Sequence, residues 1–200
     1  MRCFMLRKNL PNLLTIINLT FGMLAILVVA SADHANLVSR GNDVNLIYYS
    51  CLFVMIAALT DRFDGKLARH LGVASDLGKQ LDSLSDLVSF GVAPALIAWK
   101  LNHMSAFLLL PLGEPLAYAI AVIFPVAGAI RLAKYNLQSD PSVFRGIPIT
   151  LAGSILTLLN LFNTFMFLKD RFTRVNMISG MILMVVLSLL MVSKIPIRKI

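Results

Sequence analysis

Residues 61–86 read DRFDGKLARHLGVASDLGKQLDSLSD and separate two apolar stretches. Residues 44–60 before this segment and residues 87–99 after it contain no charged side chain. The segment itself holds five of the ten acidic residues in the chain. Apolar stretches joined by short charged segments are typical of a protein whose helices cross a membrane.

The composition of the whole chain supports the same interpretation. Of its 200 residues, 58% are hydrophobic and only 14% are charged, and the mean hydropathy is +0.81. Soluble domains carry about a quarter charged residues, so this composition excludes a soluble globular domain. The length is that of one domain, and we expect residues 1–200 to form a single one.

Six apolar runs are candidates for membrane-spanning helices. A spanning helix needs about 20 mostly apolar residues, and three of the runs reach that length only with a charged residue at one end. The six runs cover residues 9–32, 44–60, 87–99, 115–130, 146–168 and 175–193. We therefore predict an all-α integral membrane protein, a bundle of six transmembrane helices preceded by a short basic surface segment at residues 2–8.

Prolines and polar residues suggest where the helices begin and bend. Pro11 is expected to begin the first helix, because the first helical position leaves its N–H without a partner in any case. The second helix is expected to continue beyond Thr60, and the third to begin near Gly78. Pro94 and Pro125 lie within the third and fourth spans and predict bends there.

Lysine and arginine are distributed unequally between alternate connecting segments. With the N-terminus inside, the inner segments hold thirteen of them and the outer segments hold five. This bias places both termini and residues 61–86 on the cytoplasmic side of a multi-pass protein of the cell membrane. The net charge of +8 then reflects topology and contact with anionic headgroups. We expect no nucleic-acid partner, because no basic stretch is interleaved with aromatic residues.

The polar segment between the second and third spans has helical spacing. Five of its positions share one face of a helix, namely Asp61, Asp64, Gly65, Ala68 and Arg69. Asp82 and Asp86 are four residues apart and share a face of the next helix. Two antiparallel helices joined by a short connection can therefore direct four carboxylates into one space.

Four clustered carboxylates need a positive partner. Each costs about 2.5–3.5 kcal/mol at the centre of a membrane helix, and they also repel one another. Oxygen donors suit Mg²⁺, Mn²⁺ or Ca²⁺ rather than zinc, and two such ions can clamp a displacement at phosphorus. Gly65 and Ala68 leave room for a ligand, and Arg69 can grip a phosphate. Carboxylates beside a membrane are often only solvated, but fixed spacing across two helices favours a metal site.

The segment resembles the CDP-alcohol phosphatidyltransferase signature Asp-x₂-Asp-Gly-x₂-Ala-Arg-x₈-Gly-x₃-Asp-x₃-Asp at every fixed position. The resemblance implies a six-span homodimeric membrane enzyme, with one domain over residues 1–200 and a site open to the cytoplasm. It implies Mg²⁺ or Mn²⁺ as cofactor, as two ions, with Ca²⁺ as a further occupant. The metal ligands that it implies are Asp61, Asp64, Asp82 and Asp86.

The resemblance also implies roles in the reaction. The residues that would bind the CDP-lipid donor are Gly65, Ala68, Arg69, Ser75, Pro11 and Asn12. The last two are included because Leu10-Pro11-Asn12-Leu13 resembles an N-terminal piece that touches the donor in this family. Asp86 would act as general base towards the acceptor hydroxyl, whose oxygen attacks the phosphorus bearing diacylglycerol and releases CMP. A general base contributes about 10²–10⁴-fold to such a rate.

Segments that extend beyond the signature resemble the phosphatidylserine synthases of that family. They are residues 81–94, 130–136, 146–149 and 190–195. This resemblance implies L-serine as the acceptor. The carboxylate of zwitterionic serine needs a cation, for which Arg131 is the candidate, and Asn136 and Ser89 can supply neutral polar contacts. A basic anchor at a helix end is the alternative interpretation of Arg131, and a small packing residue that of Ser89.

Two other functions compete with serine transfer. The first is the same reaction with glycerol 3-phosphate or an inositol phosphate, whose phosphate calls for more cations than Arg131 alone. The second is a cation transporter, since acids inside membranes often line ion paths. A transporter predicts acids spread through the depth of the bilayer, whereas here they gather at one end. The expected partners are therefore CDP-diacylglycerol, L-serine, membrane lipids and a second copy of the chain.

Overall fold

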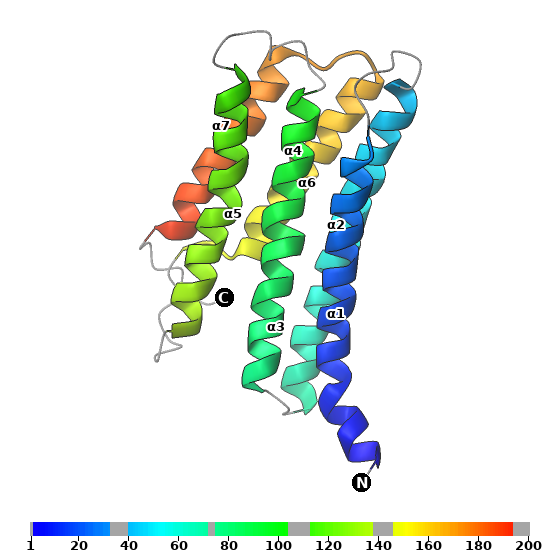
Figure 1. The fold of residues 1–200 in the computed structure, drawn as a ribbon, viewed down its shortest axis with the longest axis vertical. Helices are drawn as coiled ribbons and strands as arrows, with labels where there is room; N and C mark the ends of the chain where they lie inside the picture. Colours follow the sequence, from blue (N-terminus) through cyan, green and yellow to red (C-terminus); the bar gives the residue numbers. More distant parts are fainter. Residues whose placement is uncertain (1, 33–39, 72–74, 104–112, 138–145, 194–200) are drawn as a thin grey trace.

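The computed structural model describes residues 2–32, 40–71, 75–103, 113–137 and 146–193. For residues 2–11, 40–42, 64–71 and 113–114 it describes the backbone alone. Every regular element within these ranges is a helix, and the helices lie side by side in one bundle (Figure 1).

Three successive helices form one long rod over residues 76–103, which begins in the second half of the polar segment 61–86. The helices are α1 (Arg2–Ala30), α2 (Arg40–Leu71), α3 (Asp76–Asp86), η1 (Leu87–Val92), α4 (Ala93–His103), α5 (Gly113–Leu137), α6 (Ile149–Leu168) and α7 (Arg174–Val192). The helices α3, η1 and α4 follow one another without interruption, and η1 is a π-helix. This rod runs through the bundle between α1 and α5 (Figure 1).

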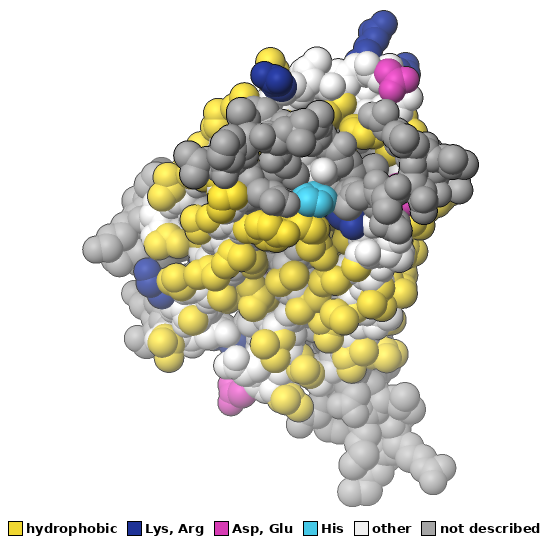
Figure 2. All heavy atoms as spheres, turned by 45° about the horizontal axis from the view of Figure 1, so that its top comes forward, with side chains coloured by type: hydrophobic (Ala, Val, Ile, Leu, Met, Phe, Trp, Pro, Cys, Tyr) yellow, Lys and Arg dark blue, Asp and Glu magenta, His cyan; other side chains and the backbone are white. Residues whose placement is uncertain are grey.

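Six of the described helical segments are long and apolar enough to cross a membrane. They are Asn12–Ala30, Asp43–Phe63, Asp76–His103, Pro115–Leu137, Ile149–Leu168 and Arg174–Val192. Large apolar side chains lie on their outer surface; Leu27, Leu59, Val122 and Leu189 are 58–68% exposed. On the face drawn in Figure 2, apolar side chains form a broad band, and most of the charged side chains lie nearer the ends of the molecule. The prediction of an all-α, multi-pass membrane protein with six spans is confirmed.

The first helix begins earlier than expected. It starts at Arg2, so Pro11 lies inside it, and the prediction that Pro11 begins the helix is wrong. A proline inside a helix removes one hydrogen bond and crowds the preceding turn. The neighbouring leucine, arginine and lysine residues are good helix formers and continue the helix on both sides. The first turns of α1 extend beyond the bundle at the end marked N (Figure 1).

The π-helix η1 follows directly after Asp86. Pro94 has no N–H, so it cannot donate the regular hydrogen bond to the carbonyl of Phe90. The N–H of the preceding residue, Ala93, bonds to the carbonyl of Val88, five residues earlier, which is the spacing of a π-helix rather than the four of an α-helix. The third span therefore changes helix type between Asp86 and the proline.

Glycines on two neighbouring helices press against η1. A Cβ atom on Gly153 of α6 would overlap the carbonyl oxygen of Phe90 and lie 2.7 Å from its Cα. A Cβ atom on Gly22 of α1 would lie 2.9 Å from the Cα of Ser89. Small residues allow helix backbones in membranes to approach this closely. The π-helix is thus held between α1 and α6.

Candidate active site

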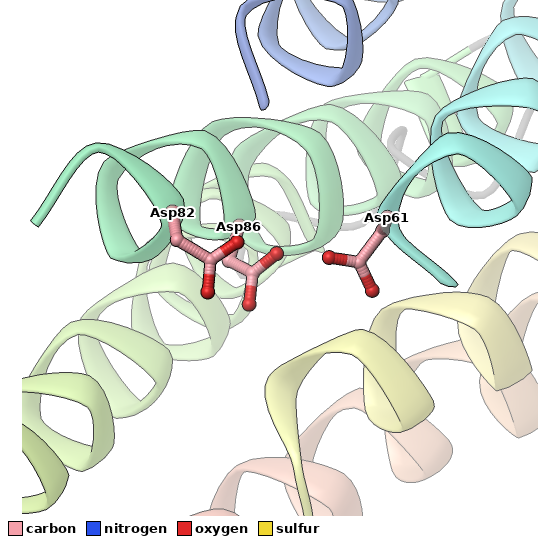
Figure 3. A group of neighbouring side chains, drawn as sticks. All are labelled: Asp61, Asp82 and Asp86. Atoms are coloured by element: carbon pink, nitrogen blue, oxygen red, sulfur yellow. The ribbon is translucent and has the colours of Figure 1, made fainter. Parts of the chain in front are cut away.

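Three carboxylates converge between two helices. Asp61 comes from α2, and Asp82 and Asp86 come from α3, one turn apart (Figure 3). One oxygen atom of each lies within 4.8 Å of an oxygen of the others. Asp61 and Asp82 are half-buried, whereas Asp86 is buried with 8% of its surface exposed. The structure therefore brings together three of the four acidic residues singled out from the sequence.

The start of α3 is fixed by a side-chain cap. Ser75 has an extended backbone, and its hydroxyl oxygen accepts a hydrogen bond from the N–H of Gly78 (3.1 Å). This contact satisfies one of the donors left over at a helix N-terminus, so α3 begins at Asp76 rather than near Gly78. Further along, the hydroxyl of Ser85 donates to the carbonyl of Thr15 (3.1 Å), which holds α3 against α1.

The carboxylate cluster fits a divalent cation. At an effective dielectric constant of about 20, two unit charges about 5 Å apart repel one another by about 3 kcal/mol. Arg62 interacts electrostatically with Asp61, and Arg131 with Asp86. These single charges offset only part of the repulsion among three carboxylates. Hard oxygen donors at this spacing are the ligands that Mg²⁺, Mn²⁺ and Ca²⁺ prefer.

The remaining predicted residues of α2 have only their backbone described. Asp64, Gly65, Ala68 and Arg69 lie within α2, which continues to Leu71. The helix expected beyond Thr60 is therefore present, and its geometry places these four positions on the same face as Asp61. The side chains of these four residues, and that of Pro11 on α1, lie outside the described part of the structure.

Two residues predicted to bind the CDP-lipid meet around Gly78. A Cβ atom on Gly78 would lie 2.9 Å from Oδ1 of Asn12 and 3.1 Å from Oγ of Ser75. Asn12 belongs to α1, and Ser75 caps α3. Because Gly78 of the signature has no side chain, polar groups from two helices can approach one another here, at the end of the bundle that carries the carboxylates.

Arg131 and Asn136 on α5 face α3. Arg131 is half-buried and interacts electrostatically with Asp86 and with Tyr135. Its Nε atom is buried and has no hydrogen-bond partner among the residues that the structure describes. The Nδ2 atom of Asn136 donates to Oγ of Ser83 (2.9 Å), one turn before Asp86. Oδ1 of Asn136 is buried and likewise has no partner within the described part of the chain.

Ser89 is placed differently from the other predicted acceptor residues. It is fully buried in η1, and its hydroxyl donates to the carbonyl of Asn18 on α1 (3.1 Å). It also packs on Gly22. The hydroxyl proton of Ser89 is used in this contact, which agrees with the alternative interpretation as a packing residue. A contact between Ser89 and the acceptor stays a prediction.

A family model described as CDP-alcohol phosphatidyltransferase matches residues 8–192. The chain belongs to the CDP-alcohol phosphatidyltransferase family. The resemblance of residues 61–86 to the family signature is thereby confirmed, and the cluster of Asp61, Asp82 and Asp86 lies within that signature. Members of the family generally depend on a divalent metal, in agreement with the donor set.

Several relatives of this phosphatidyltransferase carry more specific names. The CDP-diacylglycerol–serine O-phosphatidyltransferase of Bacillus subtilis (strain 168) is 36% identical over 152 residues, covering 76% of this chain and 75% of that protein. The enzyme of the same name from Methanocaldococcus jannaschii is 37% identical over 155 residues, 76% of this chain and 61% of that protein. The archaetidylserine synthase of Methanothermobacter thermautotrophicus is 31% identical over 147 residues, 72% of this chain and 54% of that protein.

One residue beside the cluster escapes the sequence reasoning. Ser83 occupies a variable position of the phosphatidyltransferase signature, between Asp82 and Asp86. Its contact with Asn136 joins residues that are 53 positions apart, so spacing within one helix cannot reveal it. The available signal was its place three residues before Asp86, which puts the two side chains on one face of the helix.

Proposed function

We propose that this phosphatidyltransferase transfers the phosphatidyl group of CDP-diacylglycerol to L-serine, giving phosphatidylserine and CMP. The observation that carries the proposal is two buried groups that have no hydrogen-bond partner among the described residues, a guanidinium donor on Arg131 and an amide acceptor on Asn136. A zwitterion with one carboxylate and one ammonium group complements such a pair. The names of the relatives in Bacillus and Methanocaldococcus support the same acceptor.

Asp61, Asp64, Asp82 and Asp86 would hold two divalent ions, Mg²⁺ or Mn²⁺, with Ca²⁺ as a further occupant. When bound, such ions neutralise charge on the diphosphate of the donor. The close approach of Asp61, Asp82 and Asp86 supports this assignment, and the helical backbone at position 64 is compatible with a fourth ligand on the same face.

Asp86 is the general base of the proposed reaction. It is the most buried of the three clustered carboxylates and the one that interacts with Arg131. A serine whose carboxylate is held by Arg131 therefore has its hydroxyl close to Asp86. The carboxylate accepts the hydroxyl proton while the serine oxygen bonds to the phosphorus that bears diacylglycerol. The bond from this phosphorus to the CMP oxygen breaks, and CMP leaves with the electron pair.

The donor would lie across the beginning of α3. Gly65, Ala68, Arg69, Ser75, Pro11 and Asn12 are the residues proposed to bind its CDP portion. The meeting of Asn12 and Ser75 around Gly78 supports this placement, because polar groups without bulk between them can accept a flat base or a ribose. Arg69 supplies the planar donors that suit a phosphate.

The setting of the enzyme in the membrane is part of the proposal. We place this multi-pass protein in the cytoplasmic membrane, with the active site and both termini facing the cytoplasm, because thirteen of its eighteen basic residues belong to the segments on that side. We further propose that residues 1–200 form a single domain and that two copies of the chain form a homodimer.

Phosphorylated acceptors and ion transport have less support. A glycerol 3-phosphate or inositol phosphate would set a dianion against the Oδ1 acceptor of Asn136. A transporter would need acidic side chains along the depth of the bundle, whereas Asp61, Asp82 and Asp86 lie together. The relatives named for serine transfer favour neither alternative.

The proposal is tested by CMP release from the purified protein in detergent or nanodiscs. CDP-diacylglycerol and Mn²⁺ or Mg²⁺ are supplied with serine, glycerol 3-phosphate or an inositol phosphate in separate reactions. We expect release to depend on serine, and phosphatidylserine to appear in equal amount. Release with glycerol 3-phosphate alone would refute the serine assignment and leave the family assignment intact.

A further inference from the structure

Ser83 connects the acidic helix to the proposed acceptor residues. It lies one turn before Asp86 on α3 and contacts Asn136 on α5. A second contact joins the same helices nearby, where Nζ of Lys79 lies 5.5 Å from the centre of the Tyr135 ring. The cytoplasmic ends of α3 and α5, as proposed above, are therefore tied together on the side of the site that Arg131 borders.

The hydrogen bonds of Ser83 have a defined direction. A serine hydroxyl carries one proton and can therefore donate only once. Ser83 donates this proton to the backbone carbonyl of Lys79 (Oγ···O 3.1 Å). While it makes this bond, its oxygen accepts on the side of Asn136, and the amide of Asn136 turns its NH₂ group to Ser83 (2.9 Å). The orientation of an asparagine amide is assigned from such a network.

This orientation decides which atom of Asn136 remains for a ligand. With Nδ2 bonded to Ser83, the carbonyl oxygen Oδ1 is the remaining group, and it is buried without a partner among the described residues. A buried acceptor without a donor is unfavourable, and a ligand that brings a donor relieves this. An ammonium group has three donors and no acceptor, and a phosphate dianion has no proton to give.

We propose that Ser83 is a specificity-determining positioning residue, which orients the amide of Asn136 so that its carbonyl oxygen receives the ammonium group of the acceptor. This inference rests on the proposed function, in which Arg131 takes the carboxylate of the same serine molecule. The orientation favours an amino acid and also disfavours acceptors that carry a second anionic group in that place, which adds to selectivity.

The first test is Ser83→Ala, assayed with serine and with 3-hydroxypropanoate, which keeps the carboxylate and the hydroxyl but lacks the amine. Without the serine oxygen the amide of Asn136 can present either face. We expect the ratio of kcat/KM for serine to kcat/KM for 3-hydroxypropanoate to fall about tenfold, with the KM for CDP-diacylglycerol unchanged. Ser154→Ala is the matched control, because Ser154 makes the same bond to the carbonyl four residues earlier and lies on α6. It should keep the wild-type ratio.

The second test is rescue by Asn136→Asp. A carboxylate has an oxygen in both positions, so its orientation no longer matters. In the Asn136→Asp background, Ser83→Ala should change the serine ratio by less than about twofold. The same reduction in both backgrounds would overturn the inference, because Ser83 would then act independently of Asn136. Equal losses for serine and 3-hydroxypropanoate in Ser83→Ala would also overturn it. If wild-type protein releases no CMP with serine, the proposed acceptor itself is wrong, and the inference falls with it.

Discussion

The contact between Gly153 and η1 predicts a large effect from one added methyl group. In Gly153→Ala, the new Cβ would overlap the carbonyl oxygen of Phe90 and lie within 2.7 Å of its Cα. Backbone cannot rotate away as a side chain can, so η1 or α6 must shift. Overpacking of this kind costs about 1–3 kcal/mol, offset by about 1 kcal/mol from the better helix propensity of alanine.

The shift should affect activity more than stability. A net loss of up to about 2 kcal/mol corresponds to a fall in the unfolding temperature of at most about 8 °C for a chain of this size. Because η1 follows Asp86 directly, its displacement also moves the proposed base, and a misplacement of about 1 Å can lower a rate about 10²-fold. We therefore expect kcat to fall at least about tenfold while most of the protein remains folded.

The measurement is CMP release at saturating substrates, together with a thermal unfolding curve in the same detergent. Gly180→Ala on α7 is the matched control, because within the described part of the chain its Cβ would meet only Nδ2 of Asn163, at 3.8 Å. Gly128→Ala should be intermediate, because it meets the end of the flexible Ile149 side chain. If Gly153→Ala keeps the kcat and unfolding temperature of Gly180→Ala, then η1 does not position the site.

Four further outcomes are expected. Asp86→Asn should lower kcat about 10²–10⁴-fold while binding of CMP, measured by calorimetry, is retained; full activity would exclude Asp86 as the base. Chelation of divalent ions should stop CMP release until Mn²⁺ or Mg²⁺ is restored, and Asp61→Asn should raise the Mn²⁺ concentration needed for half-maximal release about tenfold or more; an unchanged requirement would remove Asp61 from the metal site. Gly78→Ala, whose Cβ would lie 2.9 Å from Oδ1 of Asn12, should raise the KM for CDP-diacylglycerol more than that for serine. Arg131→Lys keeps the charge but loses the planar fork of donors, so the KM for serine should rise about tenfold; equal changes in both KM values would contradict its role.

Much of the fold follows from the sequence, because membrane spans are set by length and hydropathy. The uncharged runs predict all six spans, and the second helix continues beyond Thr60 as expected. The start of α1 at Arg2 and the π-helix were not predicted. Pro94 predicts a disturbance of the helix at this place, but the close packing of η1 on Gly22 and Gly153 comes from other helices, and no local pattern in residues 87–92 encodes those contacts.

The sequence likewise predicts one part of the site and not the other. The spacing of Asp82 and Asp86 on one helix is a local property, and their meeting with Asp61 follows from a short connection between antiparallel helices. The contact of Ser83 with Asn136 depends on the relative rotation of α3 and α5, which sequence periodicity does not specify. Ser89 has the chemistry of a ligand, but its hydroxyl is used in packing on α1.

The length of the α3–η1–α4 rod bears on how a lipid reaches the enzyme. Its 28 residues extend about 42 Å at about 1.5 Å per residue, close to the about 40–45 Å of a bilayer with its headgroups. Asp82 lies only about 9 Å from the first residue of the rod, so in a rod that spans the bilayer as proposed it would lie near the border between headgroups and hydrocarbon. A lipid donor can therefore present its diphosphate there while both of its chains stay among those of its neighbours. With the site placed there, donor and lipid product would exchange by lateral diffusion within one leaflet, and only the small polar reactants would come and go through water.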